Sequence, residues 1–342
     1  MKAVAINSHG GREVLKIMEL EKPEPKPGEV RVKIRATALN HLDIWVRKGF
    51  AHLKLAYPHI LGADIAGEID ALGEGVTWFK VGQKTVLHPA VSCGHCYACA
   101  SGNDNLCREY KILGENTPGG YAEYGCFPAR NALPFPEGLS FEEASAVLLP
   151  FLTAYQMVFK KSELKRGEDV LIHAAGSGVS SAAIQMAKLV GARVITTAGS
   201  DEKLELAKKL GANEVINYRK EDFSKRVREL TGKKGVEVVI DHIGQDAWEK
   251  NINSLAWGGR LVICGATSGF SGTTNLAQLF FKQLKLIGST MGTRADMMDI
   301  LKLVEKGFLK PVVGRAMPLE EAAEAHRLLE DREVFGRVVL TP

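Results

Sequence analysis

Residues 168–200 read EDVLIHAAGSGVSSAAIQMAKLVGARVITTAGS, and this stretch decides the fold. The apolar run at 169–173 is typical of a buried strand, and a turn containing two glycines follows it directly. The next segment, 181–192, has helical character, with Gly191 placed as a C-terminal stop. A second strand follows over 192–198. A strand, a tight turn, a helix and a second strand together predict a unit of parallel sheet with a right-handed crossover.

The alternation of strands and helices continues beyond this unit. DEKLELAKKLGA predicts a second helix, and further strands are predicted at EVINY, VEVVID, RLVICG and LKLIGS. Near Gly292 the alternation stops, and two helices and a last strand, GRVVLTP, follow. The first third instead shows short strands such as EVRVKIRATAL, separated by glycine- and proline-rich turns, up to about residue 140. The chain is therefore predicted to be an α/β protein with a barrel-like β domain and a doubly wound parallel-sheet domain.

The turn after the first strand of the parallel sheet has the properties of a dinucleotide site. Small residues let the backbone approach a pyrophosphate, and a helix N-terminus offers free N–H groups and a positive dipole end. The usual G-x-G-x-x-G pattern is degenerate here, since its glycine positions fall on Ala175, Ser177 and Ser180. The repeated strand–helix units that follow favour cofactor binding all the same. The residues predicted to bind the cofactor here are Gly176, Ser177, Gly178 and Val179.

The end of the next strand indicates which dinucleotide is bound. NAD sites place an Asp or Glu there to bond the ribose 2′-hydroxyl, but this strand ends at Ala198. Ser200 can donate a hydrogen bond to a 2′-phosphate and Lys203 can supply charge, so we predict NADP(H) in preference to NAD(H). Two alternatives stay open. Ser200 could simply cap the helix over 201–210 while Lys203 is solvated, and Asp201 could act as a displaced ribose ligand.

Four of the six cysteines lie close together in CGHCYACASGNDNLC, with the spacing C-x2-C-x2-C-x7-C. Four thiolates satisfy tetrahedral Zn²⁺ completely and leave no open position for water or substrate, so the predicted zinc site is structural. Redox cysteines or an iron–sulfur cluster are the alternatives, and His95 is interpreted as an exposed loop residue. The predicted ligands, in a lobe over about 90–110, are Cys93, Cys96, Cys99 and Cys107.

Composition excludes several classes of protein. The 342 residues are 45% hydrophobic and 25% charged, and the net charge is +4. No basic run is long enough to indicate nucleic-acid binding, and no apolar run approaches the roughly 18 residues of a membrane span. The N-terminal sequence lacks the features of a signal peptide, so a cytoplasmic protein is expected.

These features together resemble the medium-chain dehydrogenase/reductase family, over essentially the whole chain. The family's cysteine lobe is similar to CGHCYACASGNDNLC, and PHILGADIAGEIDALGEGV and KVGQKTVLH also resemble family sequence. The resemblance implies a GroES-like catalytic domain over 1–150, a Rossmann cofactor domain over 151–291, and a return of 292–342 to the first domain. It also implies a homodimer or homotetramer.

The catalytic zinc ligands of the family's alcohol dehydrogenases have no counterparts here. The positions that carry a thiolate, an imidazole and a second thiolate in those enzymes correspond to Asn40, Ala63 and, near LLPFLTAY, about Leu149. An amide oxygen is a poor zinc ligand, and the two alkyl side chains cannot bind a metal. A rebuilt site is the alternative, with the side chains of His41, Asp43, His59 and Asp64.

Loss of the catalytic zinc resembles the quinone oxidoreductase branch of the family. TAGSDEKLELAKKLGANEVINY is similar to that branch, in which the counterparts of Lys203 and Tyr218 contact the 2′-phosphate. By the same resemblance, Arg337 is expected to be a further residue that contacts a cofactor phosphate. Asn40 is expected to position the nicotinamide or a substrate oxygen, Thr153 to lie near the nicotinamide, and Asp64 to orient backbone.

Three functions follow as hypotheses. The leading one is NADPH-dependent reduction of a quinone, enone or enoyl thioester. Hydride addition to these acceptors gives a delocalised negative charge, so no Lewis acid is needed to stabilise it. The second is a zinc-dependent alcohol dehydrogenase with altered ligands. The third is a nucleotide-binding protein without turnover.

Overall fold

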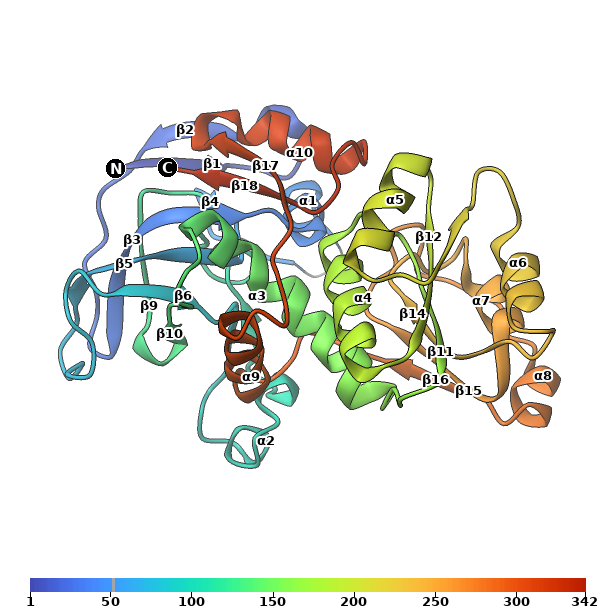
Figure 1. Cartoon of the computed structure of the whole chain (residues 1–342). Coiled ribbons are helices and arrows are strands. Elements are labelled where there is room, and N and C mark those ends of the chain that lie inside the picture. Colours follow the sequence, from blue (N-terminus) through green and yellow to red (C-terminus); the bar gives the residue numbers. More distant parts are fainter. Residues whose placement is uncertain (51–52) are drawn as a thin grey trace. The chain divides into compact units, whose positions relative to one another are not determined.

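The computed structural model describes residues 1–50 and 53–342 (Figure 1). The chain divides into two compact units. The first unit comprises Met1–Leu149 and Thr293–Pro342, and the second comprises Pro150–Gly292. Within the described residues, no helix has the length and apolar character needed to cross a membrane.

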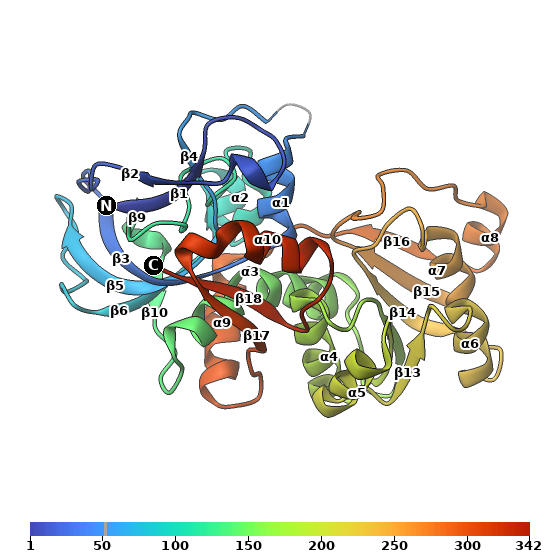
Figure 2. The ribbon, with the colours of Figure 1, turned by 90° about the horizontal axis from the view of Figure 1, so that it is seen from above.

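The second unit is a six-stranded parallel sheet with helices on both faces. Its strand order is β13-β12-β11-β14-β15-β16, which is the doubly wound order, and every neighbouring pair is parallel. Helices α4 and α5 lie on one side of the sheet and α6 and α7 on the other (Figures 1 and 2). Its elements are β11 (Asp169–Ile172), α4 (Gly178–Val190), β12 (Arg193–Ala198), α5 (Asp201–Leu210), β13 (Glu214–Asn217), α6 (Phe223–Leu230), β14 (Val236–Asp241), α7 (Trp248–Ser254), β15 (Leu255–Ile263), α8 (Leu276–Phe281) and β16 (Lys285–Gly288), preceded by a π-helical turn at Gln156–Lys161.

Burial explains why the strands of this sheet are continuous apolar runs. A strand covered on both faces has no solvent side, so it does not alternate apolar and polar residues. Leu171, Ile195, Val239 and Leu261 are fully buried in one core with side chains of α6 and α7. The predicted strands are all present, although β15 begins at Leu255, earlier than the apolar run RLVICG indicated.

The first unit is built mainly from antiparallel strands. Its largest sheet has the order β10-β6-β5-β3-β18-β17, with β9 also pairing with β3; smaller sheets are β2-β1-β4 and β7-β8. Its elements are β1 (Lys2–Ile6), β2 (Lys16–Glu19), β3 (Glu29–Ala38), α1 (His41–Lys48), β4 (His59–Ile60), β5 (Asp64–Leu72), β6 (Lys84–Leu87), β7 (Ala90–Val91), α2 (Tyr97–Ala100), β8 (Lys111–Ile112), β9 (Tyr124–Pro128), β10 (Ala132–Pro134), the start of α3 (Phe141–Tyr155), α9 (Arg294–Glu305), β17 (Val313–Pro318), α10 (Ala322–Glu330) and β18 (Arg337–Thr341).

The C-terminal segment completes the first unit. Strand β18 pairs antiparallel with β3, where Val339 faces Ala38, and parallel with β17. The segment therefore supplies two strands to a sheet whose other strands come from the first 134 residues. The two chain ends both lie in this unit (Figure 1).

A buried hydrogen-bonded chain joins helix α10 to helix α1. The Arg47 guanidinium, almost fully buried, donates to Glu330 at 2.7 Å and to Nδ1 of His326 at 3.1 Å. Because arginine only donates, Nδ1 must accept, and burial lowers the pKa of His326 to about 3 and keeps it neutral. The proton of the imidazole is then on Nε2, which donates to Tyr121 at 3.2 Å, and the Tyr121 hydroxyl donates to Asp43 at 3.3 Å.

Removing one member of this chain is predicted to be costly. Arg47→Ala removes the buried donor to both Glu330 and Nδ1 of His326 and leaves a cavity, and we expect it to lower the free energy of unfolding by about 2–4 kcal/mol. Lys48→Ala is the matched control, because Lys48 bonds the same carboxylate at 2.8 Å from an exposed position and should cost less than about 1 kcal/mol. Urea unfolding followed by circular dichroism measures both, and equal shifts for the two variants would contradict the prediction.

Candidate functional site

The turn between β11 and α4 has the geometry of an anion site. Ser177 is the N-cap of α4, and its hydroxyl accepts from the N–H of Ser180 at 3.1 Å. The N–H groups of Gly176, Gly178 and Val179 find no acceptor among the described residues. Three backbone donors and a helix N-terminus are therefore open to a pyrophosphate.

Backbone strain marks the same turn. Ala174 has φ of 53°, a left-handed conformation that costs a non-glycine residue free energy. Its N–H lies 3.3 Å from the hydroxyl of Thr197 on the neighbouring strand β12, which helps to hold this conformation. The residues predicted to bind the pyrophosphate follow Ala174 closely, at the N-terminus of α4, and their contact with a cofactor stays a prediction.

Ser200 and Asp201, which follow the end of β12, both have hydrogen-bond partners within the protein. Ser200 is the N-cap of α5 and accepts from the N–H of Lys203 at 3.4 Å, so it does cap this helix, and contact of Ser200 and Lys203 with a 2′-phosphate stays a prediction. Asp201 lies in the first turn of α5 and accepts from Asn217 at 2.8 Å and from Lys220 at 2.5 Å. The hydrogen bond from Lys220 holds the pKa of Asp201 below its usual value, so this carboxylate is ionised and already paired.

Tyr218 and Arg219 approach the glycine at the end of β12. A Cβ on Gly199 would lie 2.7 Å from the Tyr218 hydroxyl and 3.1 Å from Nε of Arg219, so only glycine allows this approach. Tyr218 was predicted from the sequence, whereas Arg219 was not. The Arg219 guanidinium has no hydrogen bond or ion pair within the described part of the chain. A basic side chain directly after a predicted phosphate ligand was the signal available in the sequence.

A second group of predicted residues meets in the first unit, around the carboxylate of Asp64. This carboxylate is fully buried and accepts from the N–H of Leu149 at 2.8 Å, from Nδ2 of Asn40 at 3.0 Å and from Arg337 at 2.5 Å. Burial raises the pKa of Asp64, against the opposing effect of the guanidinium charge and the amide. Arg337 also donates to the Asn40 carbonyl oxygen at 2.8 Å.

A second buried carboxylate fixes the backbone of Asn40. Asp43 accepts from the N–H of Asn40 at 2.7 Å and from the N–H of Gly62 at 3.1 Å. Burial raises the pKa of Asp43 to about 7, although both backbone donors oppose the rise. Asn40 is thus held at its backbone by Asp43 and at its side chain by Asp64 and Arg337. One hydrogen of its amide nitrogen is given to Asp64, and the second remains for another acceptor.

The positions that correspond to catalytic zinc ligands do converge. Asp64 bonds directly to both Asn40 and Leu149, and Ala63 precedes it in the chain. The bond from Leu149 comes from its backbone N–H, and the side chains at the three positions are an amide, a methyl and an isobutyl group, which do not form a zinc site. Across residues 1–50 and 53–342, the clusters of potential metal ligands contain only residues of the cysteine lobe. None of these clusters includes His41, Asp43, His59 or Asp64, and Nε2 of His59 lies 3.0 Å from the carbonyl oxygen of Gly114, so the rebuilt site stays an untested alternative.

The cysteine lobe places its four sulfur atoms together. The Sγ atoms of Cys93, Cys96, Cys99 and Cys107 all lie within 4.8 Å of one another. Backbone N–H groups donate to three of them, for example from Cys96 to the sulfur of Cys93 at 3.3 Å. N–H donors to Cys93 lower its pKa to about 6 and so stabilise the thiolate. The donor set fits a structural zinc ion, with four soft ligands and a supporting outer shell.

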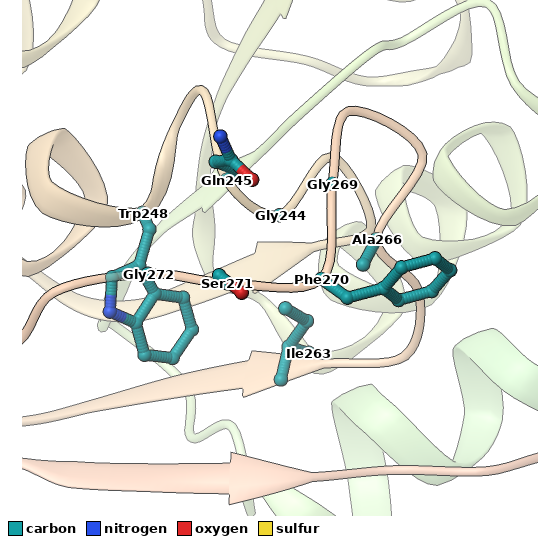
Figure 3. Close-up of a pocket in the computed structure, with 9 residues that line it drawn as sticks. All are labelled: Gly244, Gln245, Trp248, Ile263, Ala266, Gly269, Phe270, Ser271 and Gly272. Atoms are coloured by element: carbon teal, nitrogen blue, oxygen red, sulfur yellow. The ribbon is translucent and has the colours of Figure 1, made fainter.

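The carboxyl ends of β14 and β15 hold a small cavity of about 270 Å³ (Figure 3). Trp248 and Phe270 lie on opposite sides of it, with Ile263 between them (Figure 3). The indole N–H of Trp248 donates to Thr274 at 3.0 Å. The remaining lining residues are Gly244, Gln245, Ala266, Gly269, Ser271 and Gly272.

Two predicted site residues have placements that bear on their roles. Arg337 is 6% exposed, and its guanidinium is directed to Asn40 and Asp64. This position supports a role in holding the first-unit network, and contact with a cofactor phosphate stays a prediction. Thr153 is buried in α3 within the second unit, and its place beside the nicotinamide also stays a prediction.

Comparison with known proteins now defines the class of the molecule. A family described as "Alcohol dehydrogenase GroES-like domain" matches residues 26–137, and one described as "Zinc-binding dehydrogenase" matches residues 178–306. The chain is 35% identical to a quinone oxidoreductase of Pseudomonas aeruginosa, covering 100% of this chain and 99% of that protein. It is 34% identical to an alcohol dehydrogenase of Geobacillus stearothermophilus, covering 99% of each.

The structural comparison agrees with the sequence comparison. A solved structure titled "NAD-dependent alcohol dehydrogenase" is 55% identical, with a TM-score of 0.97 over 100% of both chains. These likenesses define a two-domain, dinucleotide-dependent dehydrogenase. The chain belongs to the medium-chain dehydrogenase/reductase superfamily and is an NAD(P)-dependent oxidoreductase.

The cysteine lobe generates a test by metal analysis. We expect about one zinc per purified chain, because the lobe is the only complete ligand set among the described residues. Cys96→Ser should lose most of this zinc and unfold at lower temperature while retaining cofactor affinity. Cys126→Ser, outside the lobe, is the control and should keep the metal. Two zinc ions per chain, or full zinc in Cys96→Ser, would show that the ligand assignment is incorrect.

Proposed function

We propose that the protein reduces a quinone, an enone or an enoyl thioester with NADPH, and that its zinc is structural only. The observation that carries the proposal is the convergence of Asn40 and Leu149 on Asp64, at positions where a zinc enzyme needs metal ligands. The buried carboxylate there is paired with Arg337. The Arg337 guanidinium thus supplies the positive charge in this network. For Asp64 to bind a metal instead, the buried Arg337–Asp64 ion pair would have to break, which costs free energy.

The substrates that suit such a site are those in which the negative charge formed by hydride addition is delocalised. A bound dinucleotide supplies the hydride. A simple ketone would need a strong electrophile for the developing alkoxide, whereas a conjugated acceptor spreads charge into an enolate or phenolate. The free hydrogen on the Asn40 amide nitrogen can then stabilise a substrate oxygen, because both ends of the amide are held by Asp64 and Arg337.

The preference for NADPH is supported by the end of β12. Asp201 is paired with Lys220 and Asn217, so it does not present a free carboxylate to a 2′-phosphate. Tyr218 and Arg219 lie against Gly199 and provide a hydroxyl and a guanidinium that has no partner among the described residues. Arginine binds phosphate groups through charge-assisted hydrogen bonds, which favours the phosphorylated cofactor.

A zinc-dependent alcohol dehydrogenase that uses NAD is the second candidate. The observation in its favour is the 55% identity to a structure whose title names an NAD-dependent alcohol dehydrogenase. The third hypothesis, a protein without turnover, has no such support. We further propose that the protein is cytoplasmic and forms a homodimer or homotetramer through the edge of the parallel sheet near β16, where Phe280 and Phe281 are exposed.

The reaction class is tested by assaying the purified protein with matched substrates. We expect NADPH oxidation with 1,4-naphthoquinone or 2-cyclohexenone, and this rate should not rise when Zn²⁺ is added. Oxidation of simple alcohols should be at least about 100-fold slower, because the converging side chains supply no Lewis acid. Alcohol oxidation that needs added Zn²⁺, with no quinone or enone turnover, would support the second candidate instead.

Cofactor choice is tested separately by removing Arg219. Arg219→Ala should raise the KM for NADPH about tenfold by removing a charged contact to the 2′-phosphate, while the KM for NADH stays within about twofold. Lys208→Ala is the control, since Lys208 pairs with Glu205 on the exposed side of α5. An equal rise for both cofactors would refute the assignment of Arg219 to the 2′-phosphate.

A further inference from the structure

His242 is the first residue after β14, and its side chain reaches the turn between β11 and α4, where the pyrophosphate is expected to bind. Its Nε2 lies 3.1 Å from the hydroxyl oxygen of Ser177 and 2.9 Å from that of Ser180. Strands β11 and β14 are neighbours in the sheet, with Ile172 opposite Ile240, so the two loops emerge side by side. A histidine from one loop therefore contacts the N-cap and the first turn of the helix that faces the pyrophosphate.

Counting donors fixes the direction of these hydrogen bonds. The hydroxyl hydrogen of Ser180 is given to the carbonyl oxygen of His173 at 2.5 Å, so Ser180 can only accept from other partners. The hydroxyl of Ser177 donates to Ser180 at 2.9 Å and accepts from the N–H of Ser180. The second lone pair of Ser180 is then filled by His242, whose Nε2 must carry the hydrogen.

The loop that carries His242 is itself anchored. The Asp241 carboxylate accepts from the N–H of Ile243 at 2.8 Å and of Gly244 at 3.2 Å. The carbonyl oxygen of His242 accepts from the N–H and the hydroxyl of Thr267, both at 3.3 Å. These hydrogen bonds fix the backbone of His242, so its imidazole is held in position to donate to Ser177 and Ser180.

We propose that His242 is a positioning residue for the cofactor's pyrophosphate: its Nε2–H holds Ser177 and Ser180, and through them the free N–H groups of the phosphate turn. Without this donor the N-cap hydroxyl of Ser177 loses a fixed partner. The turn, already strained at Ala174, then relaxes away from the geometry that the pyrophosphate needs. The proposal rests on membership of a dinucleotide-dependent family, and it is independent of the NADPH preference and of the substrate.

The test compares three substitutions in the full-length protein. His242→Ala removes the donor, His242→Phe keeps a ring without the donor, and His242→Gln restores an N–H near the position of Nε2. We expect Ala and Phe to raise the Kd for ADP-ribose, a probe that contains the pyrophosphate but no nicotinamide, about tenfold. Gln should bind within about threefold of the unchanged protein. At saturating cofactor, kcat should stay within about twofold for all three, so that the effect appears in the cofactor's KM.

A matched control separates this role from general loosening of the loop. Ser268 donates its hydroxyl to the carbonyl of Ile243 at 2.8 Å and does not touch the serine pair. Ser268→Ala should therefore leave the Kd for ADP-ribose unchanged. The proposal is overturned if His242→Phe binds ADP-ribose normally, if His242→Gln binds no better than His242→Phe, or if Ser268→Ala weakens binding equally. Titrations with NADPH and NADH in parallel keep this result distinct from the cofactor preference. Loss of His242 should raise both Kd values by the same factor, whereas a change in preference alters their ratio.

Discussion

The buried carboxylate of Asp64 is the constraint on which the first unit depends. It accepts from the side chain of Asn40 before α1, from the backbone of Leu149 in α3 and from Arg337 in the last strand. Three segments that are far apart in the sequence therefore meet at two oxygen atoms. An unpaired carboxylate at this depth would cost several kcal/mol, so the segments must assemble together for any of them to be stable.

This constraint also decides what chemistry the unit can perform. At the positions proposed to correspond to zinc ligands, the Asn40 side chain and the backbone N–H of Leu149 instead both bond to Asp64. The amide of Asn40 is oriented at both ends, by Asp64 and by Arg337, with its backbone held by Asp43. A pre-oriented neutral donor is effective toward a developing enolate oxygen because it does not need to reorganise during the reaction. The network that stabilises the first unit is therefore the same one that carries the proposed metal-independent reduction.

Local signals in the sequence were enough to predict the fold and part of the site. The strands of the parallel sheet are continuous apolar runs, and the cysteine spacing places four thiols in one short loop, so both features follow from neighbours in the chain. His242, Arg219 and the partners of Arg337 could not be predicted in this way. Their roles depend on which strands are neighbours and where the loops emerge, and that order is set by packing between distant segments. Arg337 shows the difference: the family resemblance implied a cofactor phosphate, which stays a prediction, whereas its buried bond to Asp64 is visible only in the structure.

The cysteine lobe makes a structural contact that fits the proposed separation of its zinc from the chemistry. The lobe residue Asp104 lies three residues before Cys107, and its carboxylate accepts from the N–H of Arg294 at 3.2 Å, at the first residue of α9. The side chain of Arg294 donates in turn to the carbonyl of Arg130 at 2.9 Å. Helix α9 begins where the chain returns to the first unit, so the lobe fixes the start of that return. The proposed tetrathiolate zinc site would give the loop the rigidity that this contact needs, because a four-residue helix and short strands cannot form a core of their own.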